Sequence, residues 1–484
     1  MISMNKVMKK ILRFYNHVNK KPIAIYINSF TDAPVLAMLA LQLIVKKENI
    51  IFVLAENNER LVSRILSFIN DFNGIFVFLN ELNIIELNDL TDKINIMQNK
   101  YKKYDLNFDT LQALYTSLSN ELARSEEFFI KYQPKLLIVG EDGIGANASL
   151  IQAARLKKIP ILDIPYGYGS YMDLENSLSQ KSQNEELYYS DDGAGLAVKD
   201  NFSHWVKKGK FSGAILLNPC FILAREELQI KLYNPWTVHG GYANVLGAES
   251  QVMFNHYLKE GVQPNKLTLT GSPYCDYLKA CLYSNNKNLG GSIKCNKDNP
   301  KSILVCWPPS YHSERSNLCE FDTYEELTST VFNFLSQLKN VTVTINLHPA
   351  VQPEFKNFVE NLNINISTSY ILDELVKHDI YVSCYSSTVR WAIALGKPVV
   401  NYDFYQFNLN DYDNAPGVLK VSKQEEFEYV MKLILEKDQY FNEIQTAQKQ
   451  ISADWGIIDG LNFERIYKVI NKLTSINIIR KVFT

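Results

Sequence analysis

The stretch Pro-Lys-Leu-Leu-Ile-Val-Gly-Glu-Asp-Gly, residues 134–143, joins a short apolar run to a polar turn. An apolar run of this length, with no polar face and a glycine at its end, is typical of a strand that is buried on both sides. Similar runs lie at 22–27, 50–54, 74–79 and 160–164, with amphipathic stretches at 34–46, 59–70 and 108–131 between them. The alternation predicts a parallel sheet covered by helices, joined by right-handed crossovers into a Rossmann-like unit.

The same alternation continues along the chain and starts again near residue 300. A helical stretch at 249–259 and a short strand at 266–270 extend the first half. A polar, Gly- and Asn-rich segment at 284–300 has no periodicity and is predicted to be a linker. Beyond it, strands are predicted at 302–306, 341–347, 364–367, 380–383 and 398–402, and the tail at 456–479 is predicted to be helical.

This pattern predicts an α/β protein with two Rossmann-type domains. The expected divisions are an N-terminal domain at 1–283, the linker at 284–300, a C-terminal domain at 301–455 and a closing helix at 456–484 that packs back on the first domain. Ligands of such sheets bind beyond the carboxyl ends of the strands. We therefore expect the parallel sheets to face a site in the cleft between the domains.

Composition excludes several classes of protein. With 484 residues, 46 % hydrophobic and 21 % charged, the chain has an ordinary globular balance, and a net charge of −2 offers no basic field for nucleic acid. The longest apolar run, 34–45, is too short to span a bilayer, which needs about 20 apolar residues. The seven cysteines are odd in number and include no C-x-x-C pair, so we expect no disulfide framework, no cysteine zinc site and a reducing cytoplasm.

Both ends of the chain combine basic and apolar residues. Polar residues interrupt the apolar part of the N-terminus, so it is not expected to be a signal peptide. The basic N-terminus and the tail at 478–483 fit a peripheral contact with the inner face of the cell membrane. Solvated helix ends explain the same residues, and the sequence leaves both interpretations open.

An acidic pair follows the predicted strand at 135–139. Asp142 is well placed to cap the helix predicted at 147–157, which would leave Glu141 free as a general base for an acceptor hydroxyl. The alternative is that both carboxylates only cap the helix. A second acidic pair, Asp191-Asp192, has no clear buried strand before it and is interpreted as part of a solvated loop.

Polar residues also follow strands of the second half. His348-Pro349 ends the strand at 341–347, where proline holds the histidine extended and its ring can donate a hydrogen bond or a proton to a phosphate. Ser386, Ser387 and Thr388 open a helix and could bind a phosphate, or one serine could simply cap it. Glu374 could accept hydrogen bonds from a ribose or complement the helix dipole.

Several other residues are weaker candidates for contacts with the donor or the acceptor. Arg315 and Arg390 stand out because arginine is scarce, and either could pair with a carboxylate on a sugar, although a structural role is the default. His312 could reach a nucleotide. Tyr166 and Tyr168 could stack on an acceptor sugar, or only turn the chain. The remaining two motifs are interpreted as loops: the tight turn His239-Gly240-Gly241 and the acidic Asp411-Tyr412-Asp413.

Taken together, Glu141-Asp142-Gly143, His348-Pro349 and Ser386-Ser387 resemble the acidic-Gly, His-Pro and Ser-Ser motifs of bacterial sialyltransferases. Related capsule enzymes that transfer nonulosonic acids or Kdo from CMP-sugars share these motifs. The stretches Lys-Leu-Thr-Leu-Thr-Gly-Ser-Pro-Tyr-Cys-Asp at 266–276 and Ala-Leu-Gly-Lys-Pro-Val-Val at 394–400 resemble glycosyltransferases of the two-Rossmann GT-B fold. The resemblance implies a GT-B-like fold, an acceptor-binding first domain and a CMP-binding second domain.

The resemblance also implies an activity and a set of roles. The activity is inverting, metal-independent transfer of a nonulosonic acid, such as pseudaminic or legionaminic acid, from a CMP-sugar to an oligosaccharide or lipid-linked glycan in capsule synthesis. Glu141 would be the base, with Asp142 as the alternative, and His348 would protonate or stabilise the departing phosphate. The expected nucleotide contacts are Pro349, Glu374, Ser386, Ser387 and Thr388. No cofactor or metal is expected, since a histidine and hydroxyls can neutralise a single phosphate.

Three other functions stay open at this stage. A UDP-sugar 2-epimerase shares the two-Rossmann layout, a Kdo transferase would use another CMP-sugar, and a non-catalytic protein of glycan assembly could have kept the fold. The sequence names neither the donor sugar, the acceptor, the linkage nor the oligomeric state.

Overall fold

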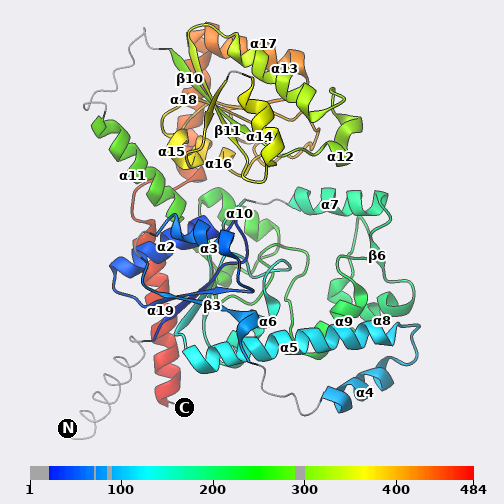
Figure 1. The fold of residues 1–484 in the computed structure, drawn as a ribbon. Coiled ribbons are helices and arrows are strands. Elements are labelled where there is room, and N and C mark those ends of the chain that lie inside the picture. Colours follow the sequence, from blue (N-terminus) through cyan, green and yellow to red (C-terminus); the bar gives the residue numbers. More distant parts are fainter. Residues whose placement is uncertain are drawn as a thin grey trace, which may run out of the picture. The chain divides into compact units, whose positions relative to one another are not determined.

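A computed structural model of the chain describes residues 21–69, 72–83, 90–168, 171–288, 300–362 and 364–483 (Figure 1). They form two compact units. Unit 1 comprises the described residues up to Ala248, then Phe254–Pro273 and the residues from Phe463 onward, and unit 2 comprises Glu249–Met253 and Tyr274–Asn462. None of the helices in these residues has both the length and the apolar character that a membrane-spanning segment requires.

Unit 1 is built on a seven-stranded sheet in which every pairing is parallel. Its strand order is β3-β2-β1-β4-β5-β8-β9, and the central strands are buried because helices cover both faces. The strands are β1 (Ile23–Tyr26), β2 (Ile50–Leu54), β3 (Ile75–Phe78), β4 (Leu136–Val139), β5 (Ile161–Asp163), β8 (Val245–Ala248) and β9 (Leu267–Leu269). A short antiparallel pair, β6 (Tyr188–Tyr189) and β7 (Ala214–Ile215), stands apart from this sheet.

The helices of unit 1 begin at short polar caps. Asn58, Asn107, Asn147 and Asn218 each accept a hydrogen bond from a backbone N–H of the first turn that follows. The helices are α2 (Ala33–Val45), α3 (Glu59–Leu66), α4 (Leu90–Tyr101), α5 (Phe108–Tyr132), α6 (Ala148–Leu156), α7 (Tyr171–Gln183), α8 (Gly193–Asn201), α9 (Pro219–Glu227), α10 (Gln251–Lys259, which begins in unit 2) and α19 (Asn462–Phe483) (Figure 1).

Unit 2 repeats the plan with a six-stranded parallel sheet in the order β12-β11-β10-β13-β14-β15. Its strands are β10 (Lys301–Trp307), β11 (Val341–Leu347), β12 (Asn365–Ser367), β13 (Ile380–Ser383), β14 (Val399–Tyr402) and β15 (Val418–Val421). Its helices are α11 (Pro273–Asn288), α12 (His312–Arg315), α13 (Tyr324–Ser336), α14 (Pro353–Glu360), α15 (Ile371–Leu375), α16 (Val389–Ala394), α17 (Gln424–Glu436) and α18 (Asp438–Trp455) (Figure 1).

Each sheet carries its own apolar core. In unit 2, Val305, Val382 and Val400 from neighbouring strands pack with Phe427 and Met431 of α17. In unit 1, alternate residues of the strands pack with α5 and α6, and a separate apolar cluster lies among α4, α5, α8 and α9. Two parallel sheets, each with its own core, confirm the predicted α/β class.

The structure shows where the predicted linker and the C-terminal tail are grouped between the two units. Helix α11 continues to Asn288, into the start of the predicted linker, and groups with unit 2 from Tyr274 onward. Residues 289–299 of that linker lie outside the described residues. The chain from Phe463 onward groups with unit 1, where Glu464 forms an ion pair of 2.8 Å with Lys46.

Candidate functional site

The strand order of each sheet reverses at one point. In unit 1 the reversal lies between β1 and β4, and in unit 2 it lies between β10 and β13. Ligands of open parallel sheets bind beyond the carboxyl ends of the strands that flank such a point. The Gly140–Gly143 turn follows β4, and the Ser386–Thr388 loop follows β13. Both motifs singled out from the sequence therefore stand where this kind of sheet binds ligands.

Glu141 is held in a defined orientation beyond β4. Its Oε1 accepts the backbone N–H of Gly145 at 2.9 Å, and its Oε2 accepts the hydroxyl of Tyr166 at 3.3 Å. A Cβ at Gly145 would lie 2.7 Å from Oε1, so a larger residue there would push the carboxylate out of this position. Burial raises the pKa of Glu141, and the charge of His239 offsets part of that rise. A carboxylate with a raised pKa, oriented by two donors, is suited to take a proton.

Asp142 has a different role from the predicted helix cap. Asn147 caps α6 instead, accepting the N–H of Leu150 at 2.9 Å. The Asp142 side chain is 1 % exposed and joins distant segments: it accepts from the backbone N–H of Ala243 at 2.6 Å and from Lys266 Nζ at 2.6 Å. The capping prediction was wrong because the carboxylate turns inward, where a lysine stabilises its charge. This geometry favours Glu141 as the base.

A buried ion pair lies beside this turn. His239 Nδ1 is 2.7 Å from Asp163 Oδ2, and the two side chains are 5 % and 0 % exposed. Burial opposes a charge on the imidazole, but the Asp163 carboxylate outweighs it and raises the pKa of His239. His239 was predicted to form part of a tight turn, and the Gly240 N–H bonds to the Thr237 carbonyl at 3.2 Å. Asp163 was not predicted from the sequence as a site residue, although an acidic residue at the last position of a buried strand is a usable signal.

Asp142, Asp163 and His239 also bring one potential metal ligand each within 4.8 Å of one another. The negative charges of the two carboxylates already have cationic partners within the protein. Lys266 Nζ stands 2.6 Å from Asp142, and the raised pKa of His239 favours an imidazolium next to Asp163. A metal ion bound here would have to displace the ammonium group, so this donor set does not fit a resident metal.

The two tyrosines predicted as acceptor contacts lie close to the same turn. Tyr166 donates its hydroxyl to Glu141, as described above, and burial raises its pKa. The Tyr168 ring packs edge-on against the His256 ring, with 5.2 Å between centroids. Both side chains are partly exposed. A contact with an acceptor sugar stays a prediction for each.

The Ser386–Thr388 loop of unit 2 is a compact set of hydroxyls. Ser386 Oγ lies 2.7 Å from Thr388 Oγ1 and accepts the Thr388 N–H at 3.2 Å. The Ser387 carbonyl accepts a hydrogen bond from Arg390, and the Ser386 carbonyl accepts one from Tyr412 at 2.9 Å. These bonds to the carbonyls hold the backbone of the loop, and all three hydroxyl-bearing residues are partly exposed.

His348 begins the loop after β11, next to β10. Its N–H bonds to the Trp307 carbonyl at 3.0 Å, and its Nδ1 accepts the Ala350 N–H at 3.1 Å. Part of the residue faces solvent, as does Pro349, yet partial desolvation lowers the pKa of His348. A neutral ring with Nδ1 as acceptor carries its proton on Nε2, which is then available as a donor to a phosphate oxygen.

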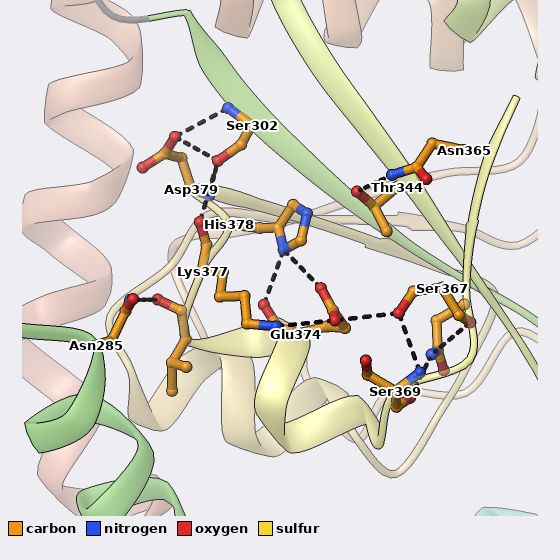
Figure 2. A network of polar contacts seen from close by, with 12 residues as sticks. Asn285, Ser302, Thr344, Asn365, Ser367, Ser369, Glu374, Lys377, His378 and Asp379 are labelled. Atoms are coloured by element: carbon orange, nitrogen blue, oxygen red, sulfur yellow. Dashed lines mark hydrogen bonds and ion pairs between the residues drawn. The ribbon is translucent and has the colours of Figure 1, made fainter. Parts of the chain in front are cut away.

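Glu374 is tied into a polar network within unit 2, and Figure 2 shows its carboxylate between Ser367 and Lys377. Ser367 Oγ and Lys377 Nζ each donate to Oε1 at 3.1 Å, and the residue is 6 % exposed. Burial alone would raise the pKa of Glu374, but the hydrogen bonds from Lys377 and its serine neighbours, together with the charge of Lys377, lower it. Its predicted contact with a ribose would require this network to open.

The other three candidates in unit 2 already have protein partners. His312 Nδ1 lies 2.8 Å from the Tyr405 hydroxyl, and Nε2 lies 3.2 Å from the Phe321 carbonyl. Arg315 is 3.4 Å from the carbonyls of Tyr405 and Gln406. Arg390 is 1 % exposed and pairs with Glu249 at 3.0 Å. This geometry favours structural roles, and contacts with a donor stay predictions.

The two acidic motifs interpreted as loops lie on the surface or in turns. Asp191 and Asp192 are exposed ahead of α8. The stretch Asp411-Tyr412-Asp413 forms a turn in which the Asp413 N–H bonds to the Asn410 carbonyl at 3.2 Å. Both interpretations are confirmed.

No protein-family model matches this sequence, and no curated protein sequence matches it. Solved structures of similar fold exist. UDP-GlcNAc 2-epimerase from Neisseria meningitidis, solved bound to UDP-GlcNAc, aligns over 93 % of this chain and 100 % of its own, with a TM-score of 0.52 and 16 % identity. The calicheamicin glycosyltransferase CalG4 aligns over 94 % of this chain and 98 % of its own, with a TM-score of 0.53 and 9 % identity.

The wall teichoic acid polymerase TagF aligns over 98 % of this chain and 95 % of its own, with a TM-score of 0.51 and 11 % identity. At such identities these likenesses establish the fold alone. The chain has a GT-B-like fold with two Rossmann-type units, as predicted. The resemblance to CMP-sugar transferases stays a prediction.

Proposed function

We propose that this chain is a glycosyltransferase that moves a sugar from a nucleotide-activated donor to a glycan hydroxyl with inversion at the anomeric carbon. The observation that carries the proposal is the setting of Glu141. This carboxylate follows β4 at the switch point of its sheet, is oriented by Gly145 and Tyr166, and has a raised pKa. These are the properties of a general base that must be ionised but not strongly hydrated.

The proposed reaction is a single displacement. Glu141 takes the proton of the acceptor hydroxyl while the oxygen forms its bond to the anomeric carbon. The bond from that carbon to the phosphate oxygen breaks, and the nucleotide departs with the electron pair. The charge of His239, which Asp163 holds in place, lowers the pKa of Glu141 and so limits the rise that burial causes.

The proposed donor is a CMP-activated nonulosonic acid. This choice rests on the resemblance of the three motifs to bacterial sialyltransferases, and two features of unit 2 support it. The neutral His348 offers Nε2–H to a phosphate oxygen, and the hydroxyls of Ser386, Ser387 and Thr388 offer further donors. A single phosphate needs no more than such groups, so we propose a reaction that requires no metal.

A second candidate is epimerisation of a UDP-sugar. The specific observation in its favour is that unit 1 holds another acid–base pair, Asp163–His239, beside Glu141. Removal of a proton from a sugar carbon and its return need two such groups. The similarity to the UDP-GlcNAc 2-epimerase shows a shared fold and leaves the chemistry undecided.

Nucleotide binding separates the two candidates. Thermal unfolding is measured with CMP, CDP, UMP and UDP at equal concentration, since a ligand that binds only the folded state raises the unfolding temperature. We expect CMP to stabilise most, and preferential stabilisation by UDP would contradict the CMP donor. Release of CMP from CMP-sialic acid, with and without EDTA, then tests transfer. Loss of activity in Glu141→Ala is expected, and full activity in that variant would remove the assigned base.

A further inference from the structure

Two adjoining cavities open on unit 1 beside the segment 229–244. Cavity A has a volume of about 360 Å³ and is lined by parts of 233–244 and 261–266. Cavity B has a volume of about 420 Å³ and is lined by parts of 201–204 and 226–242. Tyr233 and Tyr242 line both cavities, and each volume lies in the range of about 300–1,000 Å³ typical of ligand sites.

Cavity A contains a buried hydroxyl that lacks a partner. Thr237 is 6 % exposed, and its Oγ1 has no hydrogen bond within the described part of the chain. A buried hydroxyl is unfavourable unless something supplies its hydrogen bond, so such a group at a cavity wall indicates a ligand or a water. A Cβ at Gly240 would lie 1.8 Å from the Asn234 carbonyl oxygen and 2.7 Å from this hydroxyl, so only glycine fits at this position.

The charges of cavity A cancel locally. Lys266 Nζ stands 2.6 Å from Asp142, and His239 stands 2.7 Å from Asp163. Neither cation of cavity A is left over for a phosphate, so a nucleotide or another anion is disfavoured there, and the charged lining of cavity B has both signs, with Lys231, His204 and Glu226. Neutral amides supply most of the remaining polar lining, from Asn234, Asn244, Gln263 and Asn265. The Oδ1 of Asn244 accepts the Ile161 N–H at 2.7 Å, which leaves its amide N–H groups to donate to a ligand.

The shared wall of the two cavities is aromatic. Tyr233 is 50 % exposed, and its ring lies 6.4 Å from that of Tyr242 at an angle of 80°. The guanidinium of Arg155 lies 3.7 Å from the Tyr242 ring centroid and holds that ring in place. A tyrosine ring offers an apolar face and a polar tip, which match the C–H face and the hydroxyls of a pyranose.

We propose that cavities A and B form one binding site for a neutral oligosaccharide. Adjoining sugar rings pack against Tyr233 and Tyr242, and one sugar hydroxyl accepts from Thr237 Oγ1. The lining residues Asn244 and Lys266 precede β8 and β9, whereas Glu141 follows the carboxyl end of β4. Cavity A borders the turn that carries the base, because Gly241 and Lys266 of its lining donate hydrogen bonds to Asp142. The use of the site to hold a distal part of the acceptor rests on the proposed function, but the binding itself does not.

Saturation-transfer NMR and titration calorimetry on the full chain, without nucleotide, test the binding with maltotetraose, cellotetraose and chitotetraose. We expect at least one to bind the wild-type protein. Tyr233→Ala should weaken that binding at least about 5-fold through loss of the stacking surface. Thr237→Val should weaken it about 3- to 10-fold through loss of one hydrogen bond. Tyr429→Ala, which removes a tyrosine 66 % exposed on unit 2, is the matched control and should change nothing.

Failure of all three glycans to bind wild type overturns the proposal, as does unchanged binding in both variants. Thr237→Val removes an unpaired hydroxyl and keeps the side-chain shape, so it should fold, and its thermal unfolding confirms that. Transfer kinetics separate this inference from the proposed function. With both correct, Tyr233→Ala raises KM for a long acceptor and leaves kcat and CMP binding unchanged. Glycan binding without CMP binding or transfer would refute the proposed function and keep this site.

Discussion

Replacement of Glu249 by alanine should destabilise unit 2 strongly, because it leaves a buried guanidinium without its counter-charge. Arg390 and Glu249 are each 1 % exposed at the side chain, with 3.0 Å between Arg390 Nε and Glu249 Oε1. The second guanidinium nitrogen lies 3.4 Å from Oε2, and the Trp391 indole donates to Oε1 at 2.9 Å. Glu249 thus accepts three hydrogen bonds in a site closed to water.

The size of the effect follows from this burial. Removal of one partner from a buried ion pair costs about 3–5 kcal/mol, because the remaining charge stays desolvated. For a domain of about 150–250 residues each kcal/mol lowers the unfolding temperature by about 2–4 °C, so a fall of roughly 6–20 °C is expected. An exposed pair gives a contrast. Glu428→Ala removes an i,i+4 partner of Lys432, which is 53 % exposed, and should cost less than about 1 kcal/mol.

The assay is thermal and urea unfolding of wild type, Glu249→Ala, Glu249→Gln and Glu428→Ala. Glu249→Gln keeps a hydrogen-bond acceptor but loses the charge, so its unfolding temperature should lie between those of wild type and Glu249→Ala. The double variant Glu249→Leu/Arg390→Met removes both charges and should recover much of the loss. Arg390 also donates to the Ser387 carbonyl, so CMP-induced stabilisation should fall in Glu249→Ala. A Glu249→Ala protein as stable as Glu428→Ala would refute the reasoning.

Three further outcomes are expected. Glu141→Gln should lower the transfer rate about 10²- to 10⁴-fold. Because burial raises the pKa of Glu141 above its ordinary 4.5, initial rates of the wild type should fall on the acid side while the pH is still above that value. Because the Asp163 carboxylate raises the pKa of His239, the histidine should contribute stability to unit 1 that is fully present below pH 6.5, the ordinary pKa of histidine, and is lost as pH rises through its raised pKa. Urea unfolding as a function of pH measures this, and an equal slope in His239→Gln would contradict it. Lys266→Met leaves the buried Asp142 carboxylate without its cation and should lower the free energy of unfolding by about 3–5 kcal/mol in the same assay. A variant as stable as the wild type would contradict the burial of this pair.

Local pattern was enough to predict most of the fold. The strands Ile50–Leu54 and Val341–Leu347 have the predicted ends, because each is an apolar or alternating run between polar breakers. The strand Ile380–Ser383 also has the predicted ends, and most other predicted strands shift by one residue at an end. The strands Val245–Ala248 and Val418–Val421 were not predicted from the sequence. Glu141, His348 and Ser386 were found for a related reason: a polar residue directly after a buried strand lies at the carboxyl edge of a parallel sheet.

The sequence by itself therefore determined the α/β class, the two parallel sheets and the loops that follow their strands, since these depend on neighbours within a few residues. Only the tertiary structure decided which charges meet. Asp142 meets Lys266 across 124 positions, and Arg390 meets Glu249 across 141. A buried charge without a partner is unfavourable, so each buried charge pairs with a group that is near it in the folded core. The separation of the two residues along the chain does not indicate this pairing.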